Sequence, residues 1–203
     1  MSAVARWIGL PVAAVAMVAG TLTVQATHGG GSYEPLRPPA ACVERPVTSR
    51  ASGIEGLTER LVLIGLADAA CTLGVGREEL TLQLARSGDP TDAEVDALRR
   101  GLRSAVRQMK ADGTLPRASD LVDDVIDQAD LNGFVKRLIR ALPASLVDKA
   151  LKTDDVLYRT IDDLDLRKVL TDLDDSSSLD AQVEPVVTQA VKDSLKARLR
   201  DLV

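Results

Sequence analysis

The segment TDAEVDALRRGLRSAVRQMK, residues 91–110, carries the clearest helical pattern in the chain. Thr91 and Glu94 have the spacing of a capping box, in which each side chain bonds to the backbone N–H of the other residue, so a helix is expected to begin here. The apolar side chains that follow recur at three- and four-residue steps: Val95, Leu98, Leu102, Val106 and Met109. The segment therefore predicts an amphipathic helix with one buried face.

A second stripe on this helix is cationic and consists of Arg99, Arg103, Arg107 and Lys110. One interpretation is a contact face for anionic lipid headgroups or for an acidic partner. The other is a solvated face that the acidic second half of the chain partly neutralises. The whole chain has a net charge of −5, and from Asp120 onward it has 18 acidic and 12 basic residues, a net charge of −6. The sequence leaves both interpretations open.

The residues before this segment predict a central buried helix and a short one. Ser52 begins a Ser-x-x-Glu capping box, and Gly74 can supply the left-handed residue that ends a helix. Between them apolar side chains are frequent enough to widen the buried face: Leu57, Leu61, Val62, Leu63, Ile64, Leu66 and Cys71. A short helix is expected over residues 77–86, with Leu80 and Leu84 facing inward.

Residues 67–85, ADAACTLGVGREELTLQLA, resemble the core of a helix-turn-helix, with an alanine-rich helix, a Leu-Gly-Val turn and a second helix. The resemblance implies a second helix that reads DNA, and such a helix must offer cations and amides to phosphates and base edges. This helix instead opens with Arg77, Glu78 and Glu79, and the DNA backbone repels carboxylates. Two helices that meet at a Gly-Val turn are also a common packing unit, so no nucleic-acid partner is expected.

An internal repeat marks the acidic half of the chain. Residues 126–131 (IDQADL) match residues 161–166 (IDDLDL) at an offset of 35 residues. Each copy is expected to form a helix, an aspartate that caps the next helix, and that second helix. Together they predict a duplicated helical hairpin. Pro143 separates the copies, and a short helix over residues 145–151 is expected to bridge them.

The last helix is expected to begin at Pro185, because proline fits the first turn of a helix. Its apolar stripe comprises Val187, Val191, Leu195, Leu199 and Leu202. Such a stripe can pack on the same domain, or it can pair with a second copy of the chain or with a partner. Self-association through this C-terminal helix therefore stays open beside packing within the chain.

The N-terminal segment WIGLPVAAVAMVAGTLTV, residues 7–24, decides where the rest of the chain lies. It contains no ionisable side chain, and as a helix it would extend about 27 Å, close to the thickness of a hydrocarbon core. Arg6 and the α-amino group precede it, and this cationic flank favours a cytoplasmic N-terminus with the rest exported. The segment is either a membrane anchor or a signal peptide that is cleaved after Ala26. The glycine- and proline-rich residues 27–51 predict a flexible stem.

Cys42 and Cys71 are the two cysteines of the chain. Export places them in an oxidising compartment, where such a pair is expected to form a disulfide. The entropy of closing the loop between them is worth roughly 3 kcal/mol of stability. The alternative is that Cys71 is simply a small buried side chain in an apolar helix.

The composition argues against an enzyme. The one histidine, His28, lies in the stem, so a serine or cysteine nucleophile has no folded base, and a histidine-rich zinc site cannot form. One Trp, two Tyr and one Phe are too few for surfaces that stack sugars or bases. Residues 172–183, DLDDSSSLDAQV, approach a calcium loop, but Ser177 stands where a glycine is required and Val183 where a bidentate glutamate is required. No cofactor and no metal are expected.

Taken together, the patterns predict an all-α protein. Residues 1–26 form a signal anchor or signal peptide, residues 27–51 a stem, and residues 52–203 an extracytoplasmic bundle of about six to eight short helices, with candidate sub-units at 52–113 and 117–203. The expected function is that of a non-enzymatic cell-envelope module, single-pass in the membrane or secreted, that binds another envelope protein. The alternative is a peripheral domain that contacts anionic lipid, and a hydrolase or DNA-binding protein comes third.

Overall fold

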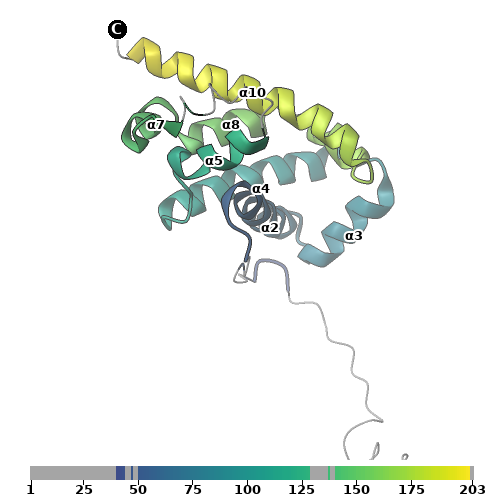
Figure 1. The fold of residues 1–203 in the computed structure, drawn as a ribbon. Helices are drawn as coiled ribbons and strands as arrows, with labels where there is room; N and C mark the ends of the chain where they lie inside the picture. The colour runs from purple at the N-terminus through teal and green to yellow at the C-terminus, as the bar shows by residue number, and fades with distance from the viewer. Residues whose placement is uncertain (1–39, 44–46, 48–49, 129–136, 138–139, 202–203) are drawn as a thin grey trace, which may run out of the picture. The chain divides into compact units, whose positions relative to one another are not determined.

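The computed structural model of the chain describes residues 40–43, 47, 50–128, 137 and 140–201. Every secondary-structure element in these ranges is an α-helix, which confirms the all-α prediction. In chain order the helices are α2 (Gly53–Leu73), α3 (Arg77–Ser87), α4 (Asp92–Ala111), α5 (Ala118–Gln128), α7 (Ala144–Ala150), α8 (Thr153–Asp163), α9 (Leu166–Thr171) and α10 (Ser176–Asp201) (Figure 1). Helices α2 and α4, with 21 and 20 residues, have close to the bounds that Ser52, Gly74 and residues 91–110 predict, whereas α10, with 26 residues, is longer than predicted. These three helices are not short, in contrast to the prediction of a bundle of short helices.

The predicted anchor, residues 7–24, lies outside the described residues, as does most of the predicted stem, residues 27–51. Among the helices that are described, none combines the length and the apolar character that crossing a membrane requires. The internal contacts of the chain group residues 39–203 into one unit.

Helices α2 and α4 form the most extensive helix–helix contact in the described chain. They approach closely because both carry glycine where they cross. A Cβ atom on Gly101 would lie 2.2 Å from the carbonyl oxygen of Gly65, and a Cβ atom on Gly65 would lie 2.7 Å from a methyl carbon of Leu102. The two backbones therefore touch with no side chain between them, and α2, which Figure 1 views almost along its axis, lies directly against α4.

One core joins both candidate sub-units, 52–113 and 117–203. Its buried side chains come from α2, α3, α4, α8 and α9: Ala69, Ala70, Leu80, Leu84, Ala97, Leu98, Leu102, Val106, Ile161, Leu166 and Leu170. Leu80 and Leu84 are thus buried as predicted, and so is the apolar stripe of α4 from Leu98 to Met109. The burial of these side chains is the main favourable term in folding.

The start of α4 is the capping box that the sequence predicts. Thr91 Oγ1 accepts from the Glu94 N–H at 3.3 Å, and the Glu94 carboxylate accepts from the Thr91 N–H at 2.7 Å. The start of α2 differs from the prediction, because Ser52 occupies the N-cap position but its side chain makes no capping bond. Asp124 of α5 instead accepts from the Ile54 N–H at 3.1 Å. A residue distant in sequence therefore replaces the predicted box.

The second copy of the repeat has the predicted form. Helix α8 ends at Asp163, and the carboxylate of Asp165 accepts from the Lys168 N–H at 3.1 Å to cap α9. The first copy begins in α5, but residues 129–136 lie outside the described residues, so the duplication stays a prediction. Helix α7 is the bridging helix that was expected over residues 145–151.

The last helix begins at Ser176, and the prediction that it begins at Pro185 is wrong. Asp175 caps it upstream, because its Oδ1 accepts from the backbone N–H groups of Ser177 and Ser178 at 3.0 and 3.2 Å. This N-cap sets the start of α10, and the proline lies inside the helix.

The buried face of α10 also differs from the predicted stripe. Ala190 and Ser194 are buried, Val187 and Val191 are half-buried, and Leu195 is exposed. Helix α10 packs against α8, and it places its small side chains in the buried positions. Small residues at a helix contact let the two backbones approach. The prediction considered only the spacing of large apolar residues, so it did not identify the face that small residues bury.

Candidate functional site

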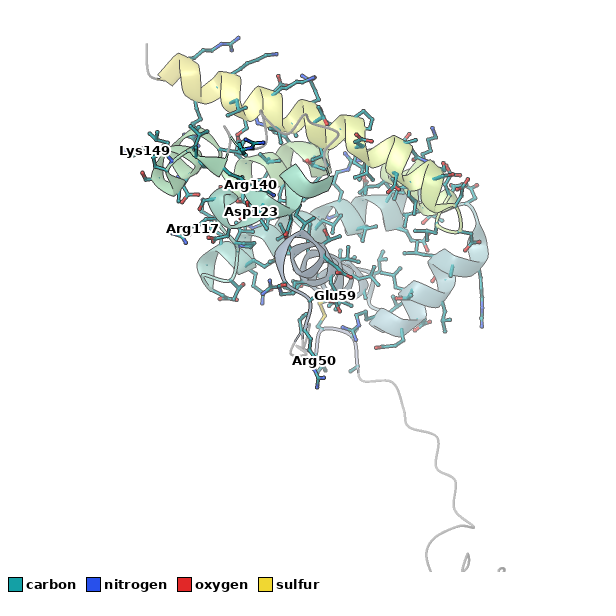
Figure 2. All side chains as sticks on the ribbon, in the orientation of Figure 1. Arg50, Glu59, Arg117, Asp123, Arg140 and Lys149 are labelled. Atoms are coloured by element: carbon teal, nitrogen blue, oxygen red, sulfur yellow. A yellow bond between two sulfur atoms is a disulfide. The ribbon has the colours of Figure 1, made fainter. Side chains whose placement is uncertain are left out.

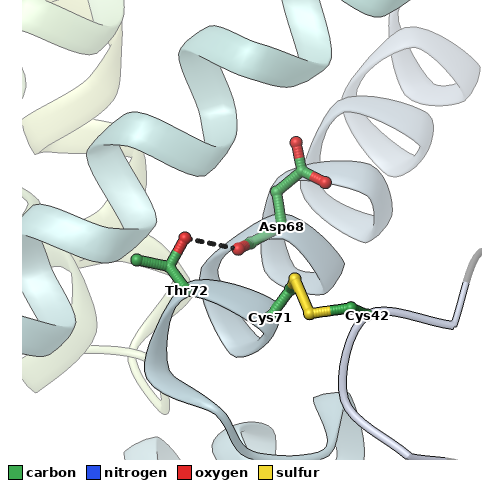
Figure 3. Close-up of a disulfide and its surroundings, with 4 residues drawn as sticks. All are labelled: Cys42, Asp68, Cys71 and Thr72. Carbon is green, nitrogen blue, oxygen red and sulfur yellow. Dashed lines mark hydrogen bonds between the residues drawn. A yellow bond between two sulfur atoms is a disulfide. The ribbon is translucent and has the colours of Figure 1, made fainter.

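The two cysteines pair as predicted. Cys42 and Cys71 are joined by a disulfide, with their Cα atoms 4.5 Å apart. Cys71 lies near the end of α2, and Cys42 has a φ of 69°, in the left-handed region. Figure 3 shows the bond beside Thr72, whose hydroxyl donates to the carbonyl oxygen of Asp68 at 2.9 Å. The disulfide therefore ties Cys42, which lies within residues 27–51, to the central helix α2.

A groove of about 560 Å³ lies next to the disulfide. Its lining includes Arg60 and Arg77 together with Asp68 and Asp112, so charges of both signs are present. The apolar part of the lining comprises Val43, Val47, Leu63, Ile64 and Ala67. Small-molecule sites are usually apolar with a few converging polar groups, and this balanced lining does not favour one class of small ligand.

The predicted basic face of α4 lies against α8. The guanidinium of Arg99 donates to the carbonyl oxygens of Asp162 at 2.8 Å and Leu164 at 3.2 Å, at the C-terminal end of α8. Arg103 forms an ion pair with the Asp162 carboxylate and lies over the ring of Tyr158, 5.4 Å from its centroid. Two cations of the face therefore hold α8 to α4.

Lys110 and Arg107 complete the predicted basic face. Lys110 forms an ion pair with Asp154, and the hydrogen bond to this carboxylate, together with its charge, raises the pKa of Lys110. Arg107 is exposed and forms no ion pair with a described residue. Three of the four cations thus bind groups of α8, as expected for a face that the acidic half of the chain neutralises.

Arg167 of α9 makes a set of contacts that sequence reasoning missed. Its guanidinium forms ion pairs with Asp89, at 3.2 Å, and with Asp92, and it also donates to the carbonyl oxygen of Pro90. It therefore joins α9 to the turn before α4. No spacing rule connects residues this far apart in the sequence. The only signal for the pairing was that Asp89 and Asp92 carry the charge opposite to that of Arg167.

Polar and charged side chains lie close together where α8 meets α10. Ser194 of α10 is fully buried, and Asp155 of α8 accepts from Arg159 Nε at 3.1 Å. Burial has the largest single effect on the pKa of Asp155 and raises it, but the nearby hydroxyl of Ser194, the hydrogen bond from Arg159 and the charges of Arg159 and Arg198 together outweigh burial. The pKa of Asp155 therefore lies below its ordinary value of 3.8.

The segment that approaches a calcium loop, residues 172–183, serves helix capping and internal hydrogen bonds. Asp172 accepts from the side-chain amide of Gln182 at 2.6 Å. Asp175 accepts from the Ser177 hydroxyl at 2.7 Å, and this bond is the main reason that the pKa of Asp175 is lowered. Within the described part of the chain, no three potential metal ligands of the His, Cys, Asp and Glu types lie together.

Arg99, Arg103, Lys110 and Arg167 form contacts between helices. No family model, curated protein or solved structure matches this chain. The functional interpretation therefore rests on the residues and their geometry.

Proposed function

We propose that the protein is a non-enzymatic cell-envelope module that binds another envelope protein through its helical faces. Residues 7–24 direct its export, and they either anchor it or are removed by cleavage after Ala26. The observation that carries the proposal is the pairing of Cys42 with Cys71. Structural disulfides persist in oxidising compartments and are rare in the cytosol, so this pairing supports a helical domain that lies outside the cytoplasm.

The sequence of α2 supports a partner on its outer side. Its residues are apolar around most of the helix, a pattern typical of helices that are covered on more than one face. Helix α4 covers one face of α2, whereas Val62 remains exposed. A protein that buried Val62 would complete the coverage of α2.

Site-specific photocrosslinking in intact cells tests this proposal. A photoreactive residue in place of Val62 is expected to give a discrete adduct with another envelope protein. The same residue in place of Arg100, which is exposed on α4, is the matched control and is expected to give none. Absence of a protein adduct at Val62 would contradict the proposal, and an adduct with a second copy of the chain would show self-association instead.

The alternative is a domain that contacts anionic lipid through the basic face of α4. It has less support, because Arg99, Arg103 and Lys110 already bind groups of α8. If the crosslinks at Val62 recover only phospholipid, a lipid-contacting domain replaces the protein-binding proposal.

A further inference from the structure

Helix α7 and the residues that flank it expose apolar side chains beside cations. None of the residues of α7 is buried. Leu142, just before the helix, and Leu146, within it, are 48% and 52% exposed. Lys149 follows Leu146 at a three-residue step, which places the two on one face, and Lys152 lies just beyond the helix; both lysines are exposed. These four side chains are called the α7 surface below.

The α7 surface is cationic although it belongs to the acidic half of the chain. Residues 140–152 contain three basic residues and one acidic residue, a net charge of +2, whereas the chain from Asp120 onward has a net charge of −6. The one acidic residue, Asp148, is used within the domain, because its carboxylate accepts from the Ser119 N–H at 2.9 Å. Asp148 keeps its own negative charge, and with this charge included the segment retains a net charge of +2.

The two lysines of the α7 surface are available to a partner. Arg140, the third cation of the segment, pairs with Asp123 of α5 at 3.2 Å. Lys149 and Lys152, in contrast, form no ion pair with a described residue. Figure 2 shows Lys149 at α7 and Arg140 close to Asp123. The uncompensated charge thus lies on the same short stretch as the exposed leucines.

Leucines flanked by cations on an exposed helix are typical of segments that lie in the interface of a bilayer. The acyl boundary of a bilayer accepts projecting leucines without a preformed pocket, and anionic headgroups attract the lysines. An acidic protein would satisfy the lysines, but it would also have to provide a pocket for each leucine.

We propose that the α7 surface docks onto an anionic phospholipid bilayer, with Leu142 and Leu146 at the acyl boundary and Lys149 and Lys152 at the headgroups. The inference rests on the proposed function in one respect, since uncleaved residues 7–24 keep the domain beside the bilayer. Tethering makes the docking step intramolecular, so a small surface suffices. The inference places the lipid contact on α7, whereas the sequence offered the basic face of α4.

Tryptophan quenching in proteoliposomes tests the inference on the full chain. Trp7 is the only tryptophan of the protein, so Trp7→Phe provides a background without tryptophan. On this background, Leu146→Trp places the reporter on the α7 surface. Leu82→Trp is the matched control, because Leu82 of α3 is also 52% exposed. The vesicles contain phospholipids with brominated acyl chains, either all zwitterionic or with an anionic fraction.

The Leu146→Trp chain is expected to be quenched in anionic vesicles and much less in zwitterionic ones, whereas the Leu82→Trp chain is quenched in neither. Each lysine near an anionic surface raises partitioning by about fivefold. Lys149→Gln with Lys152→Gln is therefore expected to lower the ratio of docked to undocked chains by roughly 25-fold. Equal quenching of the two tryptophan variants, or quenching that ignores both the lipid charge and the lysine changes, overturns the inference.

The unmodified chain separates this result from a failure of the tether, because Trp7 then reports on the N-terminal segment alone. Quenching of Trp7 without quenching in the Leu146→Trp chain overturns the α7 inference and leaves the tether in place. If neither tryptophan is quenched, the membrane anchor of the proposed function fails as well. If the true partner is an acidic protein, that protein binds the unmodified chain but not the lysine variants, and lipid quenches neither the Leu146→Trp chain nor its lysine variants.

Discussion

Gly101→Ala is expected to destabilise the protein although alanine is the better helix former. In an unconstrained helix the change gains about 1 kcal/mol. Here the added Cβ would lie 2.2 Å from the carbonyl oxygen of Gly65 and 3.0 Å from the backbone nitrogen of Ala69. Both are backbone atoms of α2, so no side chain can rotate away, and α2 and α4 have to separate along their contact.

The size of the effect follows from these opposing terms. Overpacking a well-packed contact costs about 1–3 kcal/mol, occasionally more, and the rigid backbone at Gly65 places this site toward the upper end. After the gain in helix propensity, a net loss of roughly 1–2 kcal/mol remains. For a chain of this size such a loss lowers Tm by about 2–8 °C.

Urea unfolding of the full chain in mild detergent, followed by far-UV circular dichroism, measures this loss. Arg100→Ala is the matched control, because Arg100 is the neighbouring residue of α4 and is exposed; its effect is expected to stay within about 0.5 kcal/mol. The double change Gly65→Ala with Gly101→Ala should lose less stability than the sum of the losses of the two single changes, because one separation of α2 from α4 relieves both steric clashes. A midpoint for Gly101→Ala equal to or above that of the unmodified chain would refute the reasoning.

Three further predictions concern other parts of the domain. Replacing Cys42 and Cys71 by serine is expected to cost roughly 3 kcal/mol, and an unchanged urea midpoint would count against a stabilising disulfide. The pKa of Asp155 is lowered, so its contribution to the free energy of unfolding is present above about pH 4 and is lost as the pH falls through the folded-state pKa. Asp155→Asn should therefore lower stability at neutral pH, and the difference from the unmodified chain should shrink in acid. A difference in stability that does not depend on pH would contradict this. Leu80→Ala should cost about 2–5 kcal/mol because the side chain is 1% exposed, whereas Leu82→Ala, at an exposed site of the same helix, should stay within about 0.5 kcal/mol; equal losses would show that burial does not decide the effect.

Features that depend on near neighbours in the chain could be predicted from the sequence. The capping box at Thr91 and Glu94 spans one helical turn, and the structure contains both of its hydrogen bonds. Gly74 adopts a φ of 72° and ends α2 as expected. Leu80 and Leu84 are buried at the predicted spacing. In each case the physical partners lie within a few residues of one another, so a local pattern contains the whole interaction.

Features that depend on distant partners could not be predicted. Gly65 and Gly101 have no distinctive local pattern, and their role becomes visible only where α2 crosses α4. The cap of α2 comes from Asp124 of α5. The basic stripe of α4 was compatible with two interpretations, because the group that Arg103 binds, Asp162, lies 59 residues further along the chain. Sequence periodicity identifies a face of a helix but does not identify what covers it.

The proposed function requires that the helical domain lies outside the cytoplasm with its two cysteines joined. Its most direct test is the intact mass of the protein taken from its native cells, with free thiols alkylated before lysis and no reductant added. We expect a chain that carries no alkyl group and is two hydrogen atoms lighter than the reduced form, with the bond assigned to Cys42 and Cys71. A chain alkylated at both cysteines would contradict the claim, because an exported domain with this geometry would not keep two free thiols.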